Sequence, residues 1–261
     1  MAKTEKDLRL YPSFHVENNK KPNKFLNFPF LGFLIKMILL FPVWIEAFFL
    51  GIAAFVVLLI NWFVISFTGR YWDVAYRFFL GLMRFWTKVK LYIFGITDKY
   101  PGFGLNTNGL FKLDISKPEN PNKWLAIPLL GIIVRFILLI PYLIFTDVLY
   151  RGANIAMFLS WFVILFKGRL PESFYEFERD SLRVNYAANA YIVGLSDKYP
   201  SFYISMNYQT TKIVLIIVGS ILTAFNMLGS LTPSERSAYD SNDYRYEYTP
   251  DSNQDLDYET Y

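Results

Sequence analysis

The sequence predicts an all-α integral membrane protein. We expect two tandem repeats, each a helical hairpin plus an interfacial amphipathic helix, with small cytoplasmic β segments and one C-terminal transmembrane helix. Three observations predict this class. The chain is 54% hydrophobic and 20% aromatic, which exceeds the usual composition of soluble domains. Its apolar residues gather in runs of about 18 or more, enough to cross a bilayer. The chain also repeats itself at an offset of 99 residues.

An ungapped duplication relates residues 29–103 to residues 128–202, and 28 of the 75 residue pairs are identical. The run Trp62-Phe-Val-Ile-Ser-Phe-Thr-Gly-Arg70 recurs as Trp161-Phe-Val-Ile-Leu-Phe-Lys-Gly-Arg169. A match of this length indicates the duplication of one structural unit. The predicted parts are a basic N-terminal segment (1–28), repeat 1 (29–105), a linker with a short hairpin (106–127), repeat 2 (128–208), a C-terminal transmembrane helix (211–231) and an acidic, tyrosine-rich tail (232–261).

The apolar block that opens each repeat predicts a helical hairpin. Residues 30–67 in one helix would span about 57 Å, nearly twice a hydrocarbon core of about 30 Å. Pro42 and its counterpart Pro141 stand where such a helix would break. We therefore expect a turn between Pro42 and Glu46, and both copies in the same orientation. The alternative is one tilted span per block, which would invert the second repeat.

The end of each repeat predicts an amphipathic helix. In copy 2 this segment carries six charged residues, each of which costs about 2.5–3.5 kcal/mol at the bilayer centre. In copy 1, Asp73 and Arg77 fall on one side of the helical wheel and Phe78 and Leu82 on the other. We expect both segments to lie in the membrane interface.

Short alternating stretches outside the apolar blocks predict a small sheet. Residues 8–17 and 104–115 alternate between apolar and polar residues. Asn108-Gly109 is a dipeptide typical of hairpin turns. We expect these pieces to meet on the cytoplasmic side.

The distribution of charge predicts the orientation in the membrane. The net charge is +4, but the tail from Pro233 carries −6, so residues 1–232 carry +10. Basic residues crowd the ends of the apolar runs, which suits the anionic cytoplasmic leaflet. We expect a multi-pass protein of the cell (inner) membrane, with its N-terminus and repeat loops in the cytoplasm. Nucleic acid is not expected as a partner.

Four stretches of the first copy resemble the signature of a known family. They are Phe49-Leu-Gly-Ile-Ala-Ala-Phe55, Trp62-Phe63, Phe67-Thr-Gly-Arg-Tyr71 and Thr97-Asp-Lys-Tyr-Pro101. The family is a prokaryotic membrane family catalogued as domain of unknown function 4389, and the resemblance covers roughly residues 8–105 and 110–208. It is looser in copy 2, where Tyr150-Arg-Gly-Ala153 replaces Gly51-Ile-Ala-Ala54. The resemblance implies a bacterial or archaeal membrane protein and supplies no activity.

Two intramembrane cations are the first candidate site. Lys36 and Arg135 occupy equivalent positions, and intramembrane charges often mark a lipid-phosphate, ion or proton site. The alternative is that both side chains snorkel to the headgroups. Gly69-Arg70 and Gly168-Arg169 predict helix ends with a glycine stop and a cation near the negative end of the helix dipole. An anionic headgroup is compatible with Arg70 and Arg169.

Motifs for catalysis are missing from the sequence. The chain has one histidine, His15, and no cysteine, which argues against a zinc site of the usual ligands. It contains no phosphate-binding loop, nucleophile elbow or metalloprotease motif. Glu176 and Glu178 are expected on a solvated helix face. We therefore expect no metal, no cofactor and no enzymatic activity.

The C-terminal segment predicts a docking device. Gly219, Thr223, Asn226 and Ser230 fall on one face of the last helix, and small or weakly polar residues let membrane helices approach closely. We expect the tail tyrosines to add a docking surface beyond this helix. They are Tyr239, Tyr244, Tyr246, Tyr248, Tyr258 and Tyr261.

These patterns favour a non-catalytic accessory or scaffold subunit of a larger membrane protein complex. Its expected partners are anionic lipid headgroups and other membrane protein subunits. The alternative is a small transporter or lipid-handling protein that uses the paired basic residues Lys36 and Arg135.

Overall fold

The computed structural model describes residues 11–19, 21–107, 109–127 and 130–231. The chain divides into two compact units, Met1–Ala224 and Phe225–Tyr261. Among the described residues the elements, in chain order, are β1 (Ser13–Val16), α2 (Leu31–Leu39), α3 (Phe41–Thr68), α4 (Asp73–Phe94), β2 (Phe111–Asp114), the 3-10 helix η1 (Trp124–Ala126), α5 (Leu130–Lys167), α6 (Glu172–Ile192) and α7 (Gln209–Leu231).

Each apolar block forms one long helical path, so the expected turn near Pro42 is wrong. Leu40, which joins α2 to α3, keeps right-handed helical dihedral angles (φ −80°, ψ −6°). Its N–H donates to the carbonyl of Lys36, and its own carbonyl accepts from the N–H of Trp44. In copy 2, α5 continues through Pro141. A proline removes one backbone hydrogen bond and bends a helix, but here the flanking bonds keep the path intact.

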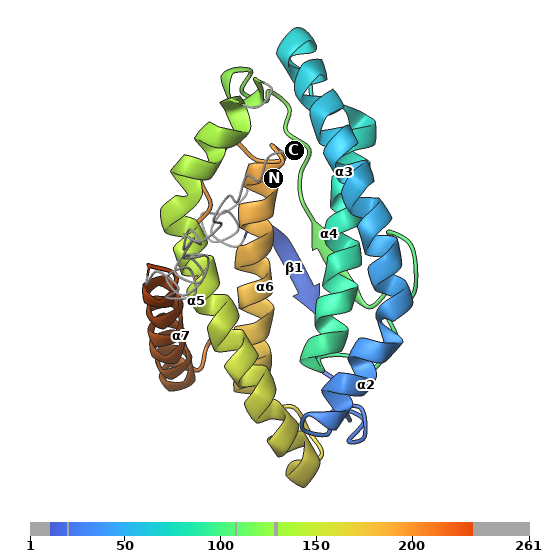
Figure 1. Ribbon diagram of the computed structural model, residues 1–261, viewed down its shortest axis with the longest axis vertical. Helices are drawn as coiled ribbons and strands as arrows, with labels where there is room; N and C mark the ends of the chain where they lie inside the picture. The colour runs from blue at the N-terminus through green and yellow to red at the C-terminus, as the bar shows by residue number, and fades with distance from the viewer. Residues whose placement is uncertain (1–10, 20, 108, 128–129, 232–261) are drawn as a thin grey trace, which may run out of the picture. The chain divides into compact units, whose positions relative to one another are not determined.

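The second helix of each repeat is present, and its expected position in the membrane interface stays a prediction. Twelve of the 22 residues of α4 and 14 of the 21 residues of α6 are buried. α4 packs on α3, α6 packs on α5, and α4 and α6 meet between the two copies (Figure 1). Their charged side chains bind to loops instead of headgroups. For example, Lys88 Nζ donates to the carbonyl of Gly104 at 2.8 Å.

The small sheet is formed by strands that are far apart in the sequence. β1 and β2 pair antiparallel, so the strand of the linker pairs with the N-terminal segment. Along β2, Phe111 and Leu113 point inward while Lys112 and Asp114 are exposed. This alternation is what the sequence predicts for a half-buried strand.

The two copies run in opposite directions, so the expectation of a common orientation is wrong. In Figure 1, α3 ascends while α5 descends. The start of α2 in copy 1 contacts the end of α5 in copy 2, with the rings of Phe33 and Trp161 5.8 Å apart. The reverse contact joins Ser66 Oγ to the carbonyl of Ala126 at 3.1 Å. The sheet register places Phe14 opposite Leu113, its equivalent 99 positions later. The copies are therefore related by an approximate two-fold axis that passes through this pair.

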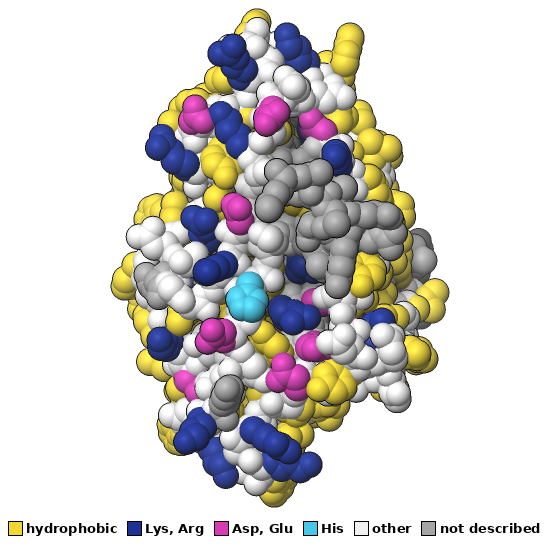
Figure 2. All heavy atoms as spheres, turned by 180° about the vertical axis from the view of Figure 1, so that it is seen from behind, with side chains coloured by type: hydrophobic (Ala, Val, Ile, Leu, Met, Phe, Trp, Pro, Cys, Tyr) yellow, Lys and Arg dark blue, Asp and Glu magenta, His cyan; other side chains and the backbone are white. Residues whose placement is uncertain are grey.

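The outer sides of α3 and α5 are apolar along their whole length. Helices α3, α5 and α7 are each long and apolar enough to cross a membrane. The face turned away from the viewer in Figure 1 instead carries Lys, Arg, Asp and Glu from end to end (Figure 2). The exposed large apolar side chains are Phe41, Trp44, Ile45, Phe48, Phe49, Ile52, Phe55, Val56, Ile60, Phe63 and Phe67 on α3, and Leu130, Ile133, Val134, Phe136, Ile137, Leu138, Ile140, Ile144, Tyr150, Leu159, Phe162 and Phe166 on α5.

Candidate functional site

The paired basic residues Lys36 and Arg135 lie inside the protein. Lys36 is 1% exposed and Arg135 is 2% exposed, so neither side chain reaches a headgroup by snorkelling. A buried charge is costly unless it is paired and hydrogen-bonded. Each of the two cations meets this requirement in its own copy.

In copy 1 an asparagine links the cation to an aspartate. Lys36 Nζ donates to Asn27 Oδ1 at 2.8 Å, and Asn27 Nδ2 donates to Asp98 Oδ1 at 3.0 Å. The second oxygen of Asp98 accepts from the backbone N–H of Asn23 at 2.7 Å. Lys36 Nζ also lies 5.4 Å from the centre of the Tyr92 ring, within the range of a cation–π contact. The ammonium and the carboxylate are therefore joined through one buried amide.

In copy 2 the cation reaches the aspartate directly. Arg135 Nη2 forms an ion pair with Asp197, and Arg135 Nη1 donates to the carbonyl of Tyr191 at 2.7 Å. Asp197 also accepts from the backbone N–H of Asn122 at 2.7 Å, as Asp98 does from Asn23. Residue 126, which replaces Asn27 in this copy, is alanine. The guanidinium of Arg135 is longer and presents several donors, so it reaches Asp197 without an asparagine between them.

We call these two networks the loop clasps: Lys36, Asn27 and Asp98 in copy 1, and Arg135 and Asp197 in copy 2. Each clasp ties the segment before the first helix to the loop after the second helix. Gly95, which ends α4 with φ 77°, allows the closure, because a Cβ there would lie 2.5 Å from Asn27 Oδ1. The clasps hold the ends of each copy together.

The residues beside the two cations were missed by the sequence analysis. The Asp-Lys-Tyr-Pro motif that contains Asp98, and recurs at Asp197, was noted only as part of the family signature. The sequence did contain one signal that could have revealed these contacts, namely two positions that change together between the copies. Lys36 with Asn27 becomes arginine with alanine in copy 2, and a coupled change of this kind indicates contact.

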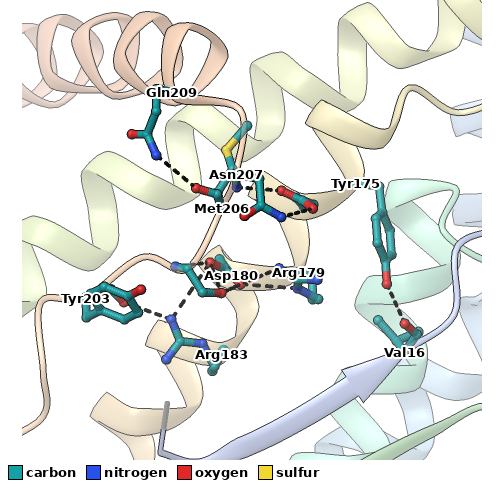
Figure 3. Close-up of polar contacts among 11 residues, drawn as sticks. Val16, Tyr175, Arg179, Asp180, Arg183, Tyr203, Met206, Asn207 and Gln209 are labelled. Carbon is teal, nitrogen blue, oxygen red and sulfur yellow. Dashed lines mark hydrogen bonds and ion pairs between the residues drawn. The ribbon is translucent and has the colours of Figure 1, made fainter. Parts of the chain in front are cut away.

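Glu176 and Glu178 on α6 are buried, so the expected solvated face is wrong. Asp180 accepts from Ser205 Oγ at 2.7 Å and pairs with Arg179 at 3.1 Å (Figure 3). Glu176, which is 7% exposed, accepts from the backbone N–H of Asn207 at 2.8 Å and from its side-chain Nδ2 at 3.1 Å. The acids of this helix hold the segment that leads into α7.

Glu178 is the exception on this helix. It is 0% exposed, and among the described residues neither of its carboxyl oxygens has a hydrogen-bond partner. Burial raises the pKa of Glu178 well above its ordinary value, and the charge of Lys36 opposes the rise. Its counterpart in copy 1 is Phe79, so this acid belongs to one copy only. The environment favours the neutral, protonated form.

The predicted headgroup residues Arg70 and Arg169 are exposed, and the structure does not bring them together. Each follows a glycine that ends a long helix with a left-handed backbone, Gly69 (φ 69°) and Gly168 (φ 67°), as expected for a glycine stop. Because the copies are antiparallel, the two arginines lie at opposite ends of the duplicated unit. Arg169 lines a cavity of about 570 Å³ at the start of α6.

The small-residue stripe of α7 is divided between the two compact units. At Gly219 a Cβ would lie 2.2 Å from the carbonyl of Val148, so α7 approaches α5 closely there. Thr223 Oγ1 donates to Asp147 Oδ2 at 2.8 Å. The other predicted members of the stripe, in the second unit, are exposed, and the tail tyrosines lie outside the described residues. Those stripe members are Asn226 and Ser230.

The part of the chain that the structure describes contains no group of three or more His, Cys, Asp or Glu that could hold a metal ion. Its chemistry is that of buried ion pairs and hydrogen bonds that fix loops to helices. A duplicated, mainly helical protein with three helices fit to cross a membrane is the class that these features define.

The family assignment agrees with this class. The model of the family described as Domain of unknown function (DUF4389) matches residues 31–104 and again residues 130–203, more than half of the chain. The chain therefore belongs to this family, as a tandem duplicate, and the resemblance expected from the sequence is confirmed. No curated protein and no solved structure matches the chain.

The loop clasps predict that stability lost by one substitution in copy 1 is restored by a second substitution that recreates the residues of copy 2. Asn27→Ala should lower the free energy of unfolding by about 1–3 kcal/mol, because Lys36 and Asp98 lose the amide between them. Adding Lys36→Arg should restore most of this loss, because it recreates the direct pair of copy 2. Thermal unfolding in detergent of the wild type, both single variants and the double variant measures the coupling. Additive effects would show that the two clasps are not equivalent.

Glu178 predicts a pH dependence of stability. The unfolded carboxyl ionises above about pH 4.3, whereas the folded carboxyl holds its proton to higher pH, so wild-type stability should fall as the pH rises above about 4.3, until the folded carboxyl ionises as well. Glu178→Gln should remove up to about 1.4 kcal/mol of this loss per pH unit. The measurement is the free energy of unfolding in detergent across this range, with the exposed Glu119→Gln as the control. Parallel curves for the wild type and Glu178→Gln would contradict the assignment.

Proposed function

We propose that this protein is a non-catalytic accessory or scaffold subunit of a membrane protein complex, with its duplicated unit lying along the cytoplasmic leaflet of the cell membrane. The observation that carries the proposal is the opposition of its two faces. The apolar stripes of α3 and α5 form one side, and charged residues cover the other side along its full length (Figures 1 and 2). Exposed apolar surface of this extent is typical of a membrane or partner contact.

The basic ends of α3 and α5 favour helices that lie in the plane of the membrane over helices that cross it. Arg70 and Arg169 lie at opposite ends of the unit, and each end gains a further lysine. The side chain of Lys123 lies beside Gly69 and that of Lys24 beside Gly168. If α3 and α5 crossed the membrane, one of these basic ends would lie outside, against the positive-inside rule. If α3 and α5 lie in the plane of one leaflet, both basic ends meet anionic headgroups on the same side of the membrane.

The exposed apolar stripes of α3 and α5 are consistent with this position. An exposed apolar surface of this length needs an apolar environment. One side of each helix packs on α4 or α6, and the other side would lie in the acyl region. The charged groups of α4, α6 and the sheet then remain in contact with water.

Helix α7 is the segment suited to cross the bilayer. Its 23 residues match the roughly 20 that a span requires. Its first part is fastened to α5 through Gly219 and Thr223.

The placement of the paired cations favours the scaffold over the transporter. A transport site needs its charged groups to meet a substrate. Lys36 and Arg135 are instead buried and engaged in the loop clasps. The exposed Asn226 and Ser230 on α7 are suited to pack against a helix of another subunit.

The in-plane position predicts the sidedness of both basic ends. The natural chain has no cysteine, so Arg70→Cys and Arg169→Cys each introduce a single thiol. Both should resist a membrane-impermeant thiol reagent in intact cells and react in inverted vesicles. If one position reacted only in intact cells and the other only in inverted vesicles, α3 and α5 would cross the membrane in opposite directions, and the in-plane position would be contradicted.

The scaffold role predicts a partner that depends on α7. The full chain, purified from its native membrane in mild detergent, should carry another membrane protein in a fixed ratio. Truncation after Leu231 should reduce this recovery, and truncation after Thr211 should abolish it while the repeats stay in the membrane. Recovery as a partner-free monomer, or full recovery after the longer truncation, would refute the role.

A further inference from the structure

A cavity of about 400 Å³ lies between the two copies, lined by residues of α3, α4 and α6. This volume is within the range of roughly 300–1,000 Å³ that is typical of small-molecule sites. Its walls include Phe55, Leu58, Leu82 and Trp86. Phe55 also belongs to the apolar stripe of α3 and is 63% exposed, so the cavity adjoins the surface that faces the lipid in the proposed arrangement.

The polar groups of this cavity are few and gather at Lys90. Lys90 Nζ donates to Asn185 Oδ1 at 3.0 Å and lies 5.7 Å from the centre of the Tyr186 ring. Asn189 Nδ2 donates to the same Asn185 oxygen at 3.1 Å. None of the described carboxylates forms an ion pair with Lys90. An ammonium has three donors, so this cation retains the capacity to bind an anion.

Burial of Lys90 has a measurable consequence. It lowers the pKa of Lys90 to about 8. A neighbouring anion would raise this pKa again, because it stabilises the charged form. Two other buried cations, Lys36 and Arg135, each have an aspartate in their network, whereas the buried Lys88 is held by backbone carbonyls. Lys90 lacks that aspartate.

The same groups distinguish the two copies. At the offset of 99, Lys90 corresponds to Asn189 and Trp86 to Asn185. All four residues line this one cavity, so it lies on the approximate two-fold axis. An unaltered duplication would place identical groups on both sides. The observed differences give the cavity one cationic, amide-lined end and an aromatic wall, which suits one asymmetric ligand.

We infer that this cavity binds a long-chain fatty acid taken from the membrane. The carboxylate would accept hydrogen bonds from Lys90 and the neighbouring amides, and the acyl chain would lie along Phe55, Leu58, Leu82 and Trp86. The charge of Lys90 suits an anion, the apolar walls suit a hydrocarbon, and the volume favours one chain over the two of a phospholipid. The inference rests on the proposed in-plane position, which turns Phe55 toward the lipid, but not on the scaffold role, because no residue of α7 lines the cavity.

The test uses the full chain in nanodiscs of zwitterionic phospholipid, with a fatty acid brominated in mid-chain as the probe. Bromine quenches tryptophan fluorescence on contact, and Trp86 lines the cavity. The acid should quench in a saturable manner, at least tenfold more tightly than its methyl ester at the same mole fraction. Trp86→Phe should remove most of the saturable quenching. Equal binding of acid and ester by the wild type would overturn the inference without any variant.

Lys90→Met provides the second arm, with the exposed Lys99→Met as the matched control. Lys90→Met should weaken binding of the acid about tenfold and leave binding of the ester unchanged, whereas Lys99→Met should alter neither. Unchanged binding of the acid to Lys90→Met would contradict the role of Lys90. Equal displacement of the probe by a zwitterionic single-chain phospholipid would contradict the assignment to a carboxylate.

Discussion

A buried cation bound to an aspartate is the interaction on which the arrangement of each copy depends. Lys36 and Arg135 enter the protein interior, where an unpaired charge would be strongly destabilising. Lys36 is joined to Asp98 through Asn27, and Arg135 is paired with Asp197 directly. These contacts fix the loop after the second helix against the segment before the first helix. The two helices of a copy therefore remain antiparallel neighbours, even though the long helix exposes an apolar face that offers no specific protein contact.

The antiparallel relation of the two closed copies explains the rest of the architecture. It brings β1 and β2 together as a sheet, with Phe14 opposite its own equivalent Leu113. It places α4 and α6 side by side as the centre of the unit and leaves the apolar sides of α3 and α5 exposed. It also creates the cavity at Lys90, which neither copy would form alone. One duplicated sequence thus yields a unit with an apolar face, a charged face and one asymmetric cavity.

The sequence predicted the duplication, the helices, the glycine stops at Gly69 and Gly168 and the family. Local patterns carry these features, because helix period, glycine dihedral angles and repeat offset are all properties of neighbouring residues. The missed features depend on distant partners. Pro141 was expected to break a helix that continues through it. Glu176 was expected in water because its partner, Asn207, lies 31 residues later in the chain. The orientation of copy 2 depends on contacts between copies, which no pattern within one copy encodes.

The antiparallel relation of the copies is the central claim, and distances between spin labels in nanodiscs test it most directly. Labels replacing Arg70 and Arg169 follow the ends of α3 and α5. Because α3 alone extends about 40 Å at about 1.5 Å per residue, this pair should give a distance of that order or longer. Labels replacing Lys24 and Arg169 should be close, since the Lys24 side chain lies beside Gly168. A short distance between Arg70 and Arg169 together with a long distance between Lys24 and Arg169 would show that the copies are parallel and would contradict the account.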